Sequence, residues 1–95
     1  MTTTRTPGRR RRRRRKRRAL VLTAAYLRSA DGGYTVEVLE AVGVHSQGDD
    51  LDSARRNLHE VVALMLEEAP SQFGTRRADP PPGSLLETLF VVLPA

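Results

Sequence analysis

The clearest alternation of apolar and polar positions lies between residues 51 and 69. Apolar residues recur there at spacings of three and four, which forms one continuous stripe and predicts an amphipathic helix. The stripe consists of Leu51, Ala54, Leu58, Val61, Val62, Met65 and Ala69. Asp50 is a good N-cap, because its carboxylate can accept the unpaired N–H groups of the first turn. Pro70 predicts that the helix ends by Ala69, since proline disfavours helical geometry in the residue before it.

Upstream of this helix the spacing of apolar residues changes to two, the period of a half-buried strand. Tyr34, Val36 and Val38 alternate there with Thr35, Glu37 and Leu39. The sequence Asp31-Gly32-Gly33 before this strand predicts a tight turn. Gly43 separates the strand from residues 44–47, which are short enough to form an edge strand.

Residues 19–27 are apolar on both faces of a strand, which predicts a buried central strand. The same run follows a basic segment, so the start of a secretory signal is an alternative interpretation. The run is short, contains Thr23 and ends at Arg28, which favours the strand. A bilayer span takes about 20 residues, so the run is too short to cross a membrane.

After the helix, residues 70–84 predict a loop and residues 85–93 predict a last strand. Pro80-Pro81-Pro82 should make part of this loop extended. A strand that follows a helix most simply pairs in parallel with an earlier strand through a right-handed crossover. We therefore expect parallel pairing for the last strand.

The order of these elements resembles the HicB family of antitoxins. The residues that carry the resemblance are Gly32, Gly33, Tyr34, Gly43, Ser46, Gln47, Gly48, Asp49, Ala54 and Leu58. The resemblance implies an α+β domain over residues 19–95 with a partial ribonuclease-H-like fold. That fold has a three-stranded antiparallel meander, one helix and a fourth strand. The family implies a function as well, which is to bind and block a HicA-type toxin that cleaves messenger RNA.

The chain departs from the family pattern at three places. Val42-Gly43-Val44 stands where a Pro-Gly-Cys run is common, and Asp50 stands where a threonine cap is common. Ser53 replaces the glutamate that would complete a reciprocal capping box, so we expect that box to be lost.

The two signs of charge are segregated along the chain, which has 95 residues and a net charge of +5. Residues 1–18 contain eleven basic residues and no acid, whereas the rest contains five basic and eleven acidic residues, a net charge of −6. An acidic domain should repel nucleic acid and attract a basic protein.

The basic segment predicts a disordered tail at residues 1–18, because it has little to bury and repels itself. It would bind nucleic acid without sequence preference, through phosphate neutralisation and counterion release. The candidate contacts are Arg9, Arg10, Arg11, Arg12, Arg13, Arg14, Arg15, Lys16, Arg17 and Arg18. A solvated tail with no selected role is the alternative.

Few residues could support catalysis or hold a metal. The chain has no cysteine, and its two histidines, His45 and His59, cannot fill a tetrahedral site alone. Ribonuclease-H-type catalysis needs clustered carboxylates that hold metal ions. Glu37 is alone on its strand, and Glu40 would point to the opposite face. We interpret the chain as non-catalytic, with no cofactor.

Two functions remain. The first is a cytoplasmic antitoxin whose acidic residues steer a basic HicA-type toxin toward it. The candidate partner-binding residues are Asp49, Asp52, Glu60, Glu67 and Glu68. The second is a nucleic-acid-associated protein in which the arginine-rich tail binds and the domain is an oligomerising scaffold. Neither function needs a membrane, and a homo-oligomer is compatible with both.

Overall fold

The computed structural model describes residues 19–74 and 77–92, so the predicted tail lies outside the described residues. The elements are β1 (Ala19–Arg28), β2 (Tyr34–Val38), β3 (His45–Gly48), α2 (Leu51–Glu68), the 3-10 turn η1 (Pro70–Gln72) and β4 (Leu85–Val92). The predicted order of three strands, a helix and a fourth strand is confirmed, as is the α+β class.

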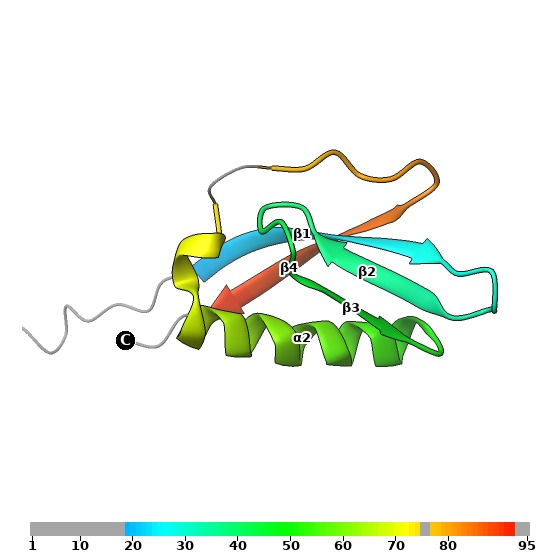
Figure 1. Ribbon diagram of the computed structural model, residues 1–95, viewed down its shortest axis with the longest axis horizontal. Helices are drawn as coiled ribbons and strands as arrows, with labels where there is room; N and C mark the ends of the chain where they lie inside the picture. The colour runs from blue at the N-terminus through cyan, green and yellow to red at the C-terminus, as the bar shows by residue number, and fades with distance from the viewer. Residues whose placement is uncertain (1–18, 75–76, 93–95) are drawn as a thin grey trace, which may run out of the picture.

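The four strands form one sheet in the order β3-β2-β1-β4, and every neighbouring pair is antiparallel. The long apolar strand β1 is therefore central, as its two apolar faces predict, and β3 is an edge strand. Figure 1 shows α2 along one side of the sheet and the chain that leads into β4 on the other side. We call the helix side the closed face and the other side the open face.

The prediction that the last strand pairs in parallel is wrong. Strand β4 pairs antiparallel with β1, with Ala19 opposite Val92 and Tyr26 opposite Leu85. The reason is the path of the chain after the helix. The segment before β4 returns along the open face to the end of the sheet where α2 began (Figure 1). Strand β4 then runs in the same direction as α2. The connection from β3 to β4 thus consists of the helix and the return segment together, and it brings β4 antiparallel to β1.

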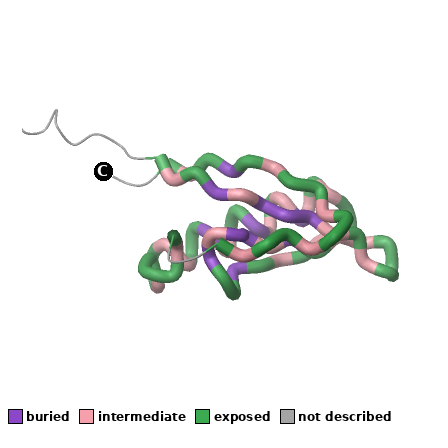
Figure 2. Tube along the Cα trace, turned by 90° about the horizontal axis from the view of Figure 1, so that it is seen from above, coloured by how far each residue is buried: buried purple, intermediate pink, exposed green. Residues whose placement is uncertain are grey.

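The core lies between α2 and the closed face of the sheet. Leu22 and Tyr26 of β1 have exposed fractions of 1% and 2%, and Leu58 of α2 is fully buried. The buried segments follow the strands and the inner side of the helix (Figure 2). All buried side chains in the described ranges are apolar or, for Tyr26, aromatic. The apolar stripe of the helix therefore faces the core, with Ala54, Leu58 and Val62 at its centre.

The start of α2 is fixed by a reciprocal capping box, so the predicted loss of that box is wrong. The Ser53 backbone N–H donates to the Asp50 carboxylate over 2.8 Å, and the Asp50 backbone N–H donates to the Ser53 hydroxyl over 3.1 Å. A serine hydroxyl accepts the same bond that a glutamate would accept. Gly48 lies two residues before this cap, and a Cβ there would clash with the Ala54 backbone nitrogen. Only glycine allows β3 to approach the helix so closely.

Candidate partner-binding surface

The five acids predicted to contact a partner are all exposed. Asp49 lies in the turn before α2, and the other four lie on the helix. With 3.6 residues per turn, Asp52, Glu60 and Glu67 fall on the side of α2 that is opposite Leu58. Asp52 and Glu67 are about 22 Å apart along the axis, at 1.5 Å per residue. The structure thus places these acids along an outward helix face and does not gather them into one pocket.

The outward face also contains cations, which reduce its negative charge. Arg55 pairs with Asp52, with a distance of 2.9 Å between Nη1 and Oδ1. Arg56 is exposed and lies four residues after Asp52 and four before Glu60, which is the spacing of neighbours on one helix face. The first half of the helix is therefore mixed in charge, and the strongest negative charge lies toward its C-terminal end.

Glu67 and Glu68 occupy the last turn of α2, where no basic residue is present. The C-terminal end of a helix carries partial negative charge, so acids at this end are unfavourable for the helix. Both side chains are exposed. Helix stability does not explain these two acids, and they form the most strongly negative part of the helix surface.

Asp49 lies at the other end of the helix and borders a polar hollow of about 390 Å³. Asp31 lines the same hollow, together with Gln47 and Asn57. The Asn57 side chain donates to the Gln47 carbonyl over 2.8 Å, which holds one wall of the hollow to the helix. Two carboxylates at one polar hollow make this end suitable for a basic side chain of a partner.

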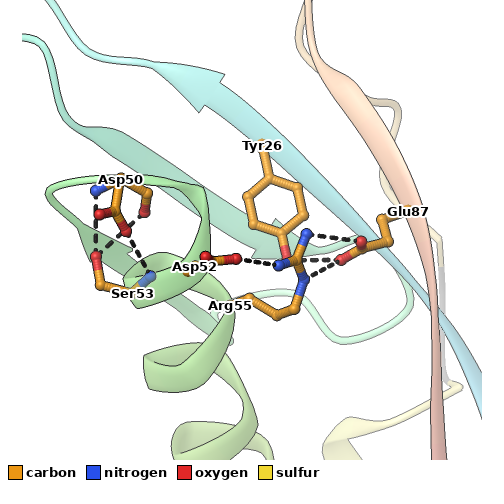
Figure 3. A network of polar contacts seen from close by, with 6 residues as sticks. All are labelled: Tyr26, Asp50, Asp52, Ser53, Arg55 and Glu87. Carbon is orange, nitrogen blue, oxygen red and sulfur yellow. Dashed lines mark hydrogen bonds and ion pairs between the residues drawn. The ribbon is translucent and has the colours of Figure 1, made fainter.

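A polar network that the sequence did not reveal ties the helix to the last strand (Figure 3). The Arg55 guanidinium donates to both carboxylate oxygens of Glu87, over 3.0 Å from Nε and 2.9 Å from Nη2. The Tyr26 hydroxyl donates to the same carboxylate over 2.9 Å. Arg55 also lies over the Tyr26 ring, 5.9 Å from its centroid. Such bidentate pairing fixes geometry as well as charge.

The network changes the acidity of its members. Burial, and then the hydrogen bond to Glu87, raise the pKa of Tyr26 to about 12. The hydrogen bond from Arg55 lowers the pKa of Glu87 below its ordinary value of 4.5. Both shifts favour the state in which a neutral phenol and a charged carboxylate coexist. The network is thus a structural tie that is stable at neutral pH.

Glu40 forms a second tie at the end of β2. Its carboxylate accepts from the Thr23 backbone N–H over 2.6 Å and from the Thr23 hydroxyl over 2.8 Å. Arg77 lies 3.4 Å from the same carboxylate. Strand β2 ends at Val38, so the predicted alternation of faces between Glu37 and Glu40 does not apply. The Glu40 carboxylate instead accepts a backbone N–H of β1 that a neighbouring strand would otherwise accept.

Neither histidine belongs to a cluster of potential ligands. His45 and His59 are both exposed. Within residues 19–74 and 77–92, no three His, Cys, Asp or Glu side chains lie close enough together to hold a metal ion. The cations of residues 9–18, predicted to contact nucleic acid, lie outside the described ranges.

No family model matches the chain, and the searches of curated proteins and of solved structures gave no match. Among the described residues, no helix has the length and apolarity needed to cross a membrane.

Proposed function

We propose that the chain is the antitoxin of a type II toxin–antitoxin pair, which binds a HicA-type toxin and prevents its cleavage of messenger RNA. The exposed acids that extend from Asp49 to Glu68 carry this proposal. They give a basic ribonuclease a surface of opposite charge, which speeds encounter and favours the correct orientation. The order of strands and helix, together with the glycine and Ser-Gln-Gly-Asp positions that resemble the HicB family, supports the same function.

In this proposal the chain inhibits by covering the toxin and has no catalytic role. Glu67 and Glu68 would meet the positive surface with which the toxin holds RNA. The hollow beside Asp49 would receive a basic side chain at the other end of the helix. A toxin that bridges both ends would contact the whole outward helix face. We place this interaction in the cytoplasm, where the absence of cysteine suits a reducing environment.

The test is co-expression with the product of an adjacent toxin-like reading frame. We expect the two proteins to purify together and the chain to restore growth to cells that express the toxin. In a cleavage assay, substoichiometric chain should leave the excess toxin active, because a covering inhibitor is consumed in a fixed ratio. If every toxin molecule is inactivated by substoichiometric chain, inhibition is catalytic. If the two proteins neither purify together nor restore growth, the chain is not the antitoxin of that toxin.

One sequence feature favours a second candidate function, nucleic-acid binding through the tail. Residues 9–18 are ten consecutive cations. Each phosphate contact releases counterions, so affinity for DNA or RNA should fall steeply as salt rises. Deleting residues 1–18 should abolish this binding and leave the circular dichroism spectrum of the domain unchanged. If the deletion removes nucleic-acid binding but leaves toxin inhibition intact, the tail is an accessory and the acidic domain is the inhibitor.

A further inference from the structure

Strand β4 presents a long edge, and Glu87 is the single charged residue of the strand. It lies at the end of the sheet beyond β1, and its other side has no partner strand among the described residues. Four of its residues, Leu86, Thr88, Phe90 and Val92, are exposed and occupy alternate positions. In the register with β1 they lie on the same face as Val21 and Ala25. This open-face row is thus mostly apolar, and the exposed fraction of Phe90 reaches 67%.

The two edge strands of the sheet differ, and β4 lacks the features that protect an edge strand from pairing with another chain. Edge strands of monomers are usually short, charged or interrupted by proline, since a bare edge invites pairing with another chain. Strand β3 follows this rule, with only four residues and with Asp49 and Asp50 directly after it. Strand β4 has eight residues without proline, glycine or a basic residue. Its one acid, Glu87, is held by Arg55 on the closed face.

We propose that β4 is a homodimer interface, in which β4 of a second copy pairs antiparallel with it across a two-fold axis. The proposal goes beyond the antitoxin function and holds whether or not a toxin binds. The paired edges would join two four-stranded sheets into one sheet. A two-fold axis perpendicular to the sheet keeps the same face upward in both copies. The two open-face rows would then meet as one apolar stripe centred near Thr88.

Charge argues for a second copy over the other occupants. A basic partner gains little at β4, because the Glu87 carboxylate already pairs with Arg55 and the open-face row has no acid. The basic segment of the same chain is a poor match, because residues 9–18 are all cationic and offer no apolar side chains to match Phe90. Another β4 supplies an extended and mostly apolar segment, and its single acid, Glu87, already pairs with Arg55 of its own copy.

Two surfaces would then serve two purposes. The outward face of α2 lies across the sheet from the open-face row, so a dimer leaves that helix face accessible (Figure 1). Each copy could still bind a basic partner. The dimer would also hold two arginine-rich tails, and two tails raise the effective concentration of cations near one nucleic acid.

The first test is the oligomeric state of the full-length chain, measured by light scattering and sedimentation over a range of concentrations. High salt in these runs removes nucleic acid that could bridge two tails. We expect a dimer, because apolar strand pairing persists at high salt. Phe90→Lys should give a monomer with an unchanged circular dichroism spectrum, since the side chain is exposed. Val42→Lys is the matched control, because Val42 is 56% exposed in a turn, and it should stay dimeric.

The second test uses the absence of cysteine from the chain. Of three single-cysteine variants, at Leu86, Thr88 and Phe90, the one nearest the two-fold axis should form an intermolecular disulfide rapidly. The other two should cross-link slowly, because in an antiparallel pair those positions lie too far from their own copies. A disulfide needs Cα atoms roughly 4.4–6.8 Å apart, so it reports strand pairing directly. Val42→Cys is the control and should cross-link slowly. Leu86→Lys provides a second monomeric variant if Phe90→Lys fails to fold.

Three results would overturn the proposal. The first is a wild-type chain that stays monomeric at every concentration, even if β4 later proves to contact a toxin. The second is a Phe90→Lys or Leu86→Lys variant that folds and remains dimeric. The third is equal cross-linking at Thr88→Cys and Val42→Cys, because random collision would explain it.

Discussion

Arg55 and Glu87 join the helix to the last strand through two hydrogen bonds of 3.0 and 2.9 Å, although they lie 32 positions apart in the sequence. The segment that separates them contains the turn after the helix and the proline-rich return along the open face. Local structure alone therefore does not place β4 beside the helix. The ladder with β1 positions β4, the bidentate pair links that strand to α2, and Tyr26 of β1 joins the same contact.

Tyr26→Phe should change how stability depends on alkaline pH. The folded-state pKa of Tyr26 is about 12, above the ordinary value of 10.0, so folding favours the neutral phenol. This contribution is fully present below pH 10 and is lost as pH rises toward 12. Wild type should thus lose stability over that interval, and Tyr26→Phe should lose less. At neutral pH the variant should lose about 1 kcal/mol, the usual value of one hydrogen bond.

The measurement for Tyr26 is chemical denaturation at several pH values, with the phenolate absorbance recorded beside it. Tyr34→Phe is the control variant, because it leaves Tyr26 as the only tyrosine. The absorbance of that control should report the raised pKa directly. An ordinary tyrosine titration in Tyr34→Phe would show that the Tyr26–Glu87 contact does not form in solution.

Glu87→Gln should change the response to acid. The pKa of Glu87 in the folded state lies below its ordinary value of 4.5, so its contribution is present above that value and disappears as pH falls through the folded pKa. The variant should melt at a modestly lower temperature at neutral pH, because half-exposed ion pairs contribute little. As the pH falls below 4.5, the two melting temperatures should converge. A constant difference at all pH values would mean that the charge of Glu87 is not what Arg55 recognises.

Leu58→Ala should be the most damaging of these substitutions. Leu58 is fully buried between the helix and the sheet, so the change removes apolar contact and leaves a cavity. Such changes cost about 2–5 kcal/mol, a large fraction of the stability of a small domain. Leu64→Ala is the matched control, because Leu64 lies on the same helix with an exposed fraction of 51%. Thermal melts that fall equally for both variants would show that the stripe does not face the core.

The sequence predicts most of the fold because the strongest signals are local. The stripe around Leu58 fixes the helix and its inner face, and the apolar run of β1 fixes the central strand. The prediction of a parallel β4 is wrong, because the direction of this strand depends on the path of the 16-residue connection between α2 and β4 and not on the strand itself. Ser53 was missed as a cap partner because the usual pattern requires glutamate, whereas a hydroxyl can accept the same bond.

The site is less predictable than the fold. The acids on the helix are visible in the sequence, and their exposure follows from the apolar stripe. The role of Glu40 is not visible, because its carboxylate bonds to Thr23 across 17 positions of sequence. The pairing of Arg55 with Glu87 is not visible in the sequence either, because the two residues lie 32 positions apart. Long-range polar contacts depend on the final register of strands, and no local pattern encodes that register.

Reversing the charge of Glu67 and Glu68 to lysine should stabilise the fold while it weakens binding to a basic toxin. The C-terminal end of a helix favours cations, so each change should add about 0.3–1 kcal/mol at low salt. Association with the toxin should slow by on the order of tenfold at low salt, and the difference should shrink as salt rises. A fold that becomes more stable while association slows would exclude misfolding as the cause of the weaker binding. Asp50 is unsuitable for this test, because its carboxylate caps the helix.

Asp79→Lys is the matched control for this charge reversal. Asp79 is exposed in the segment on the open face, away from the outward face of α2 (Figure 1). The Asp79→Lys variant has the same change in net charge as Glu67→Lys, but its association with the toxin should slow much less. The measurement is the association rate against ionic strength, with growth rescue in parallel. If Asp79→Lys slows association as much as Glu67→Lys does, only net charge matters and the helix face is not the binding surface.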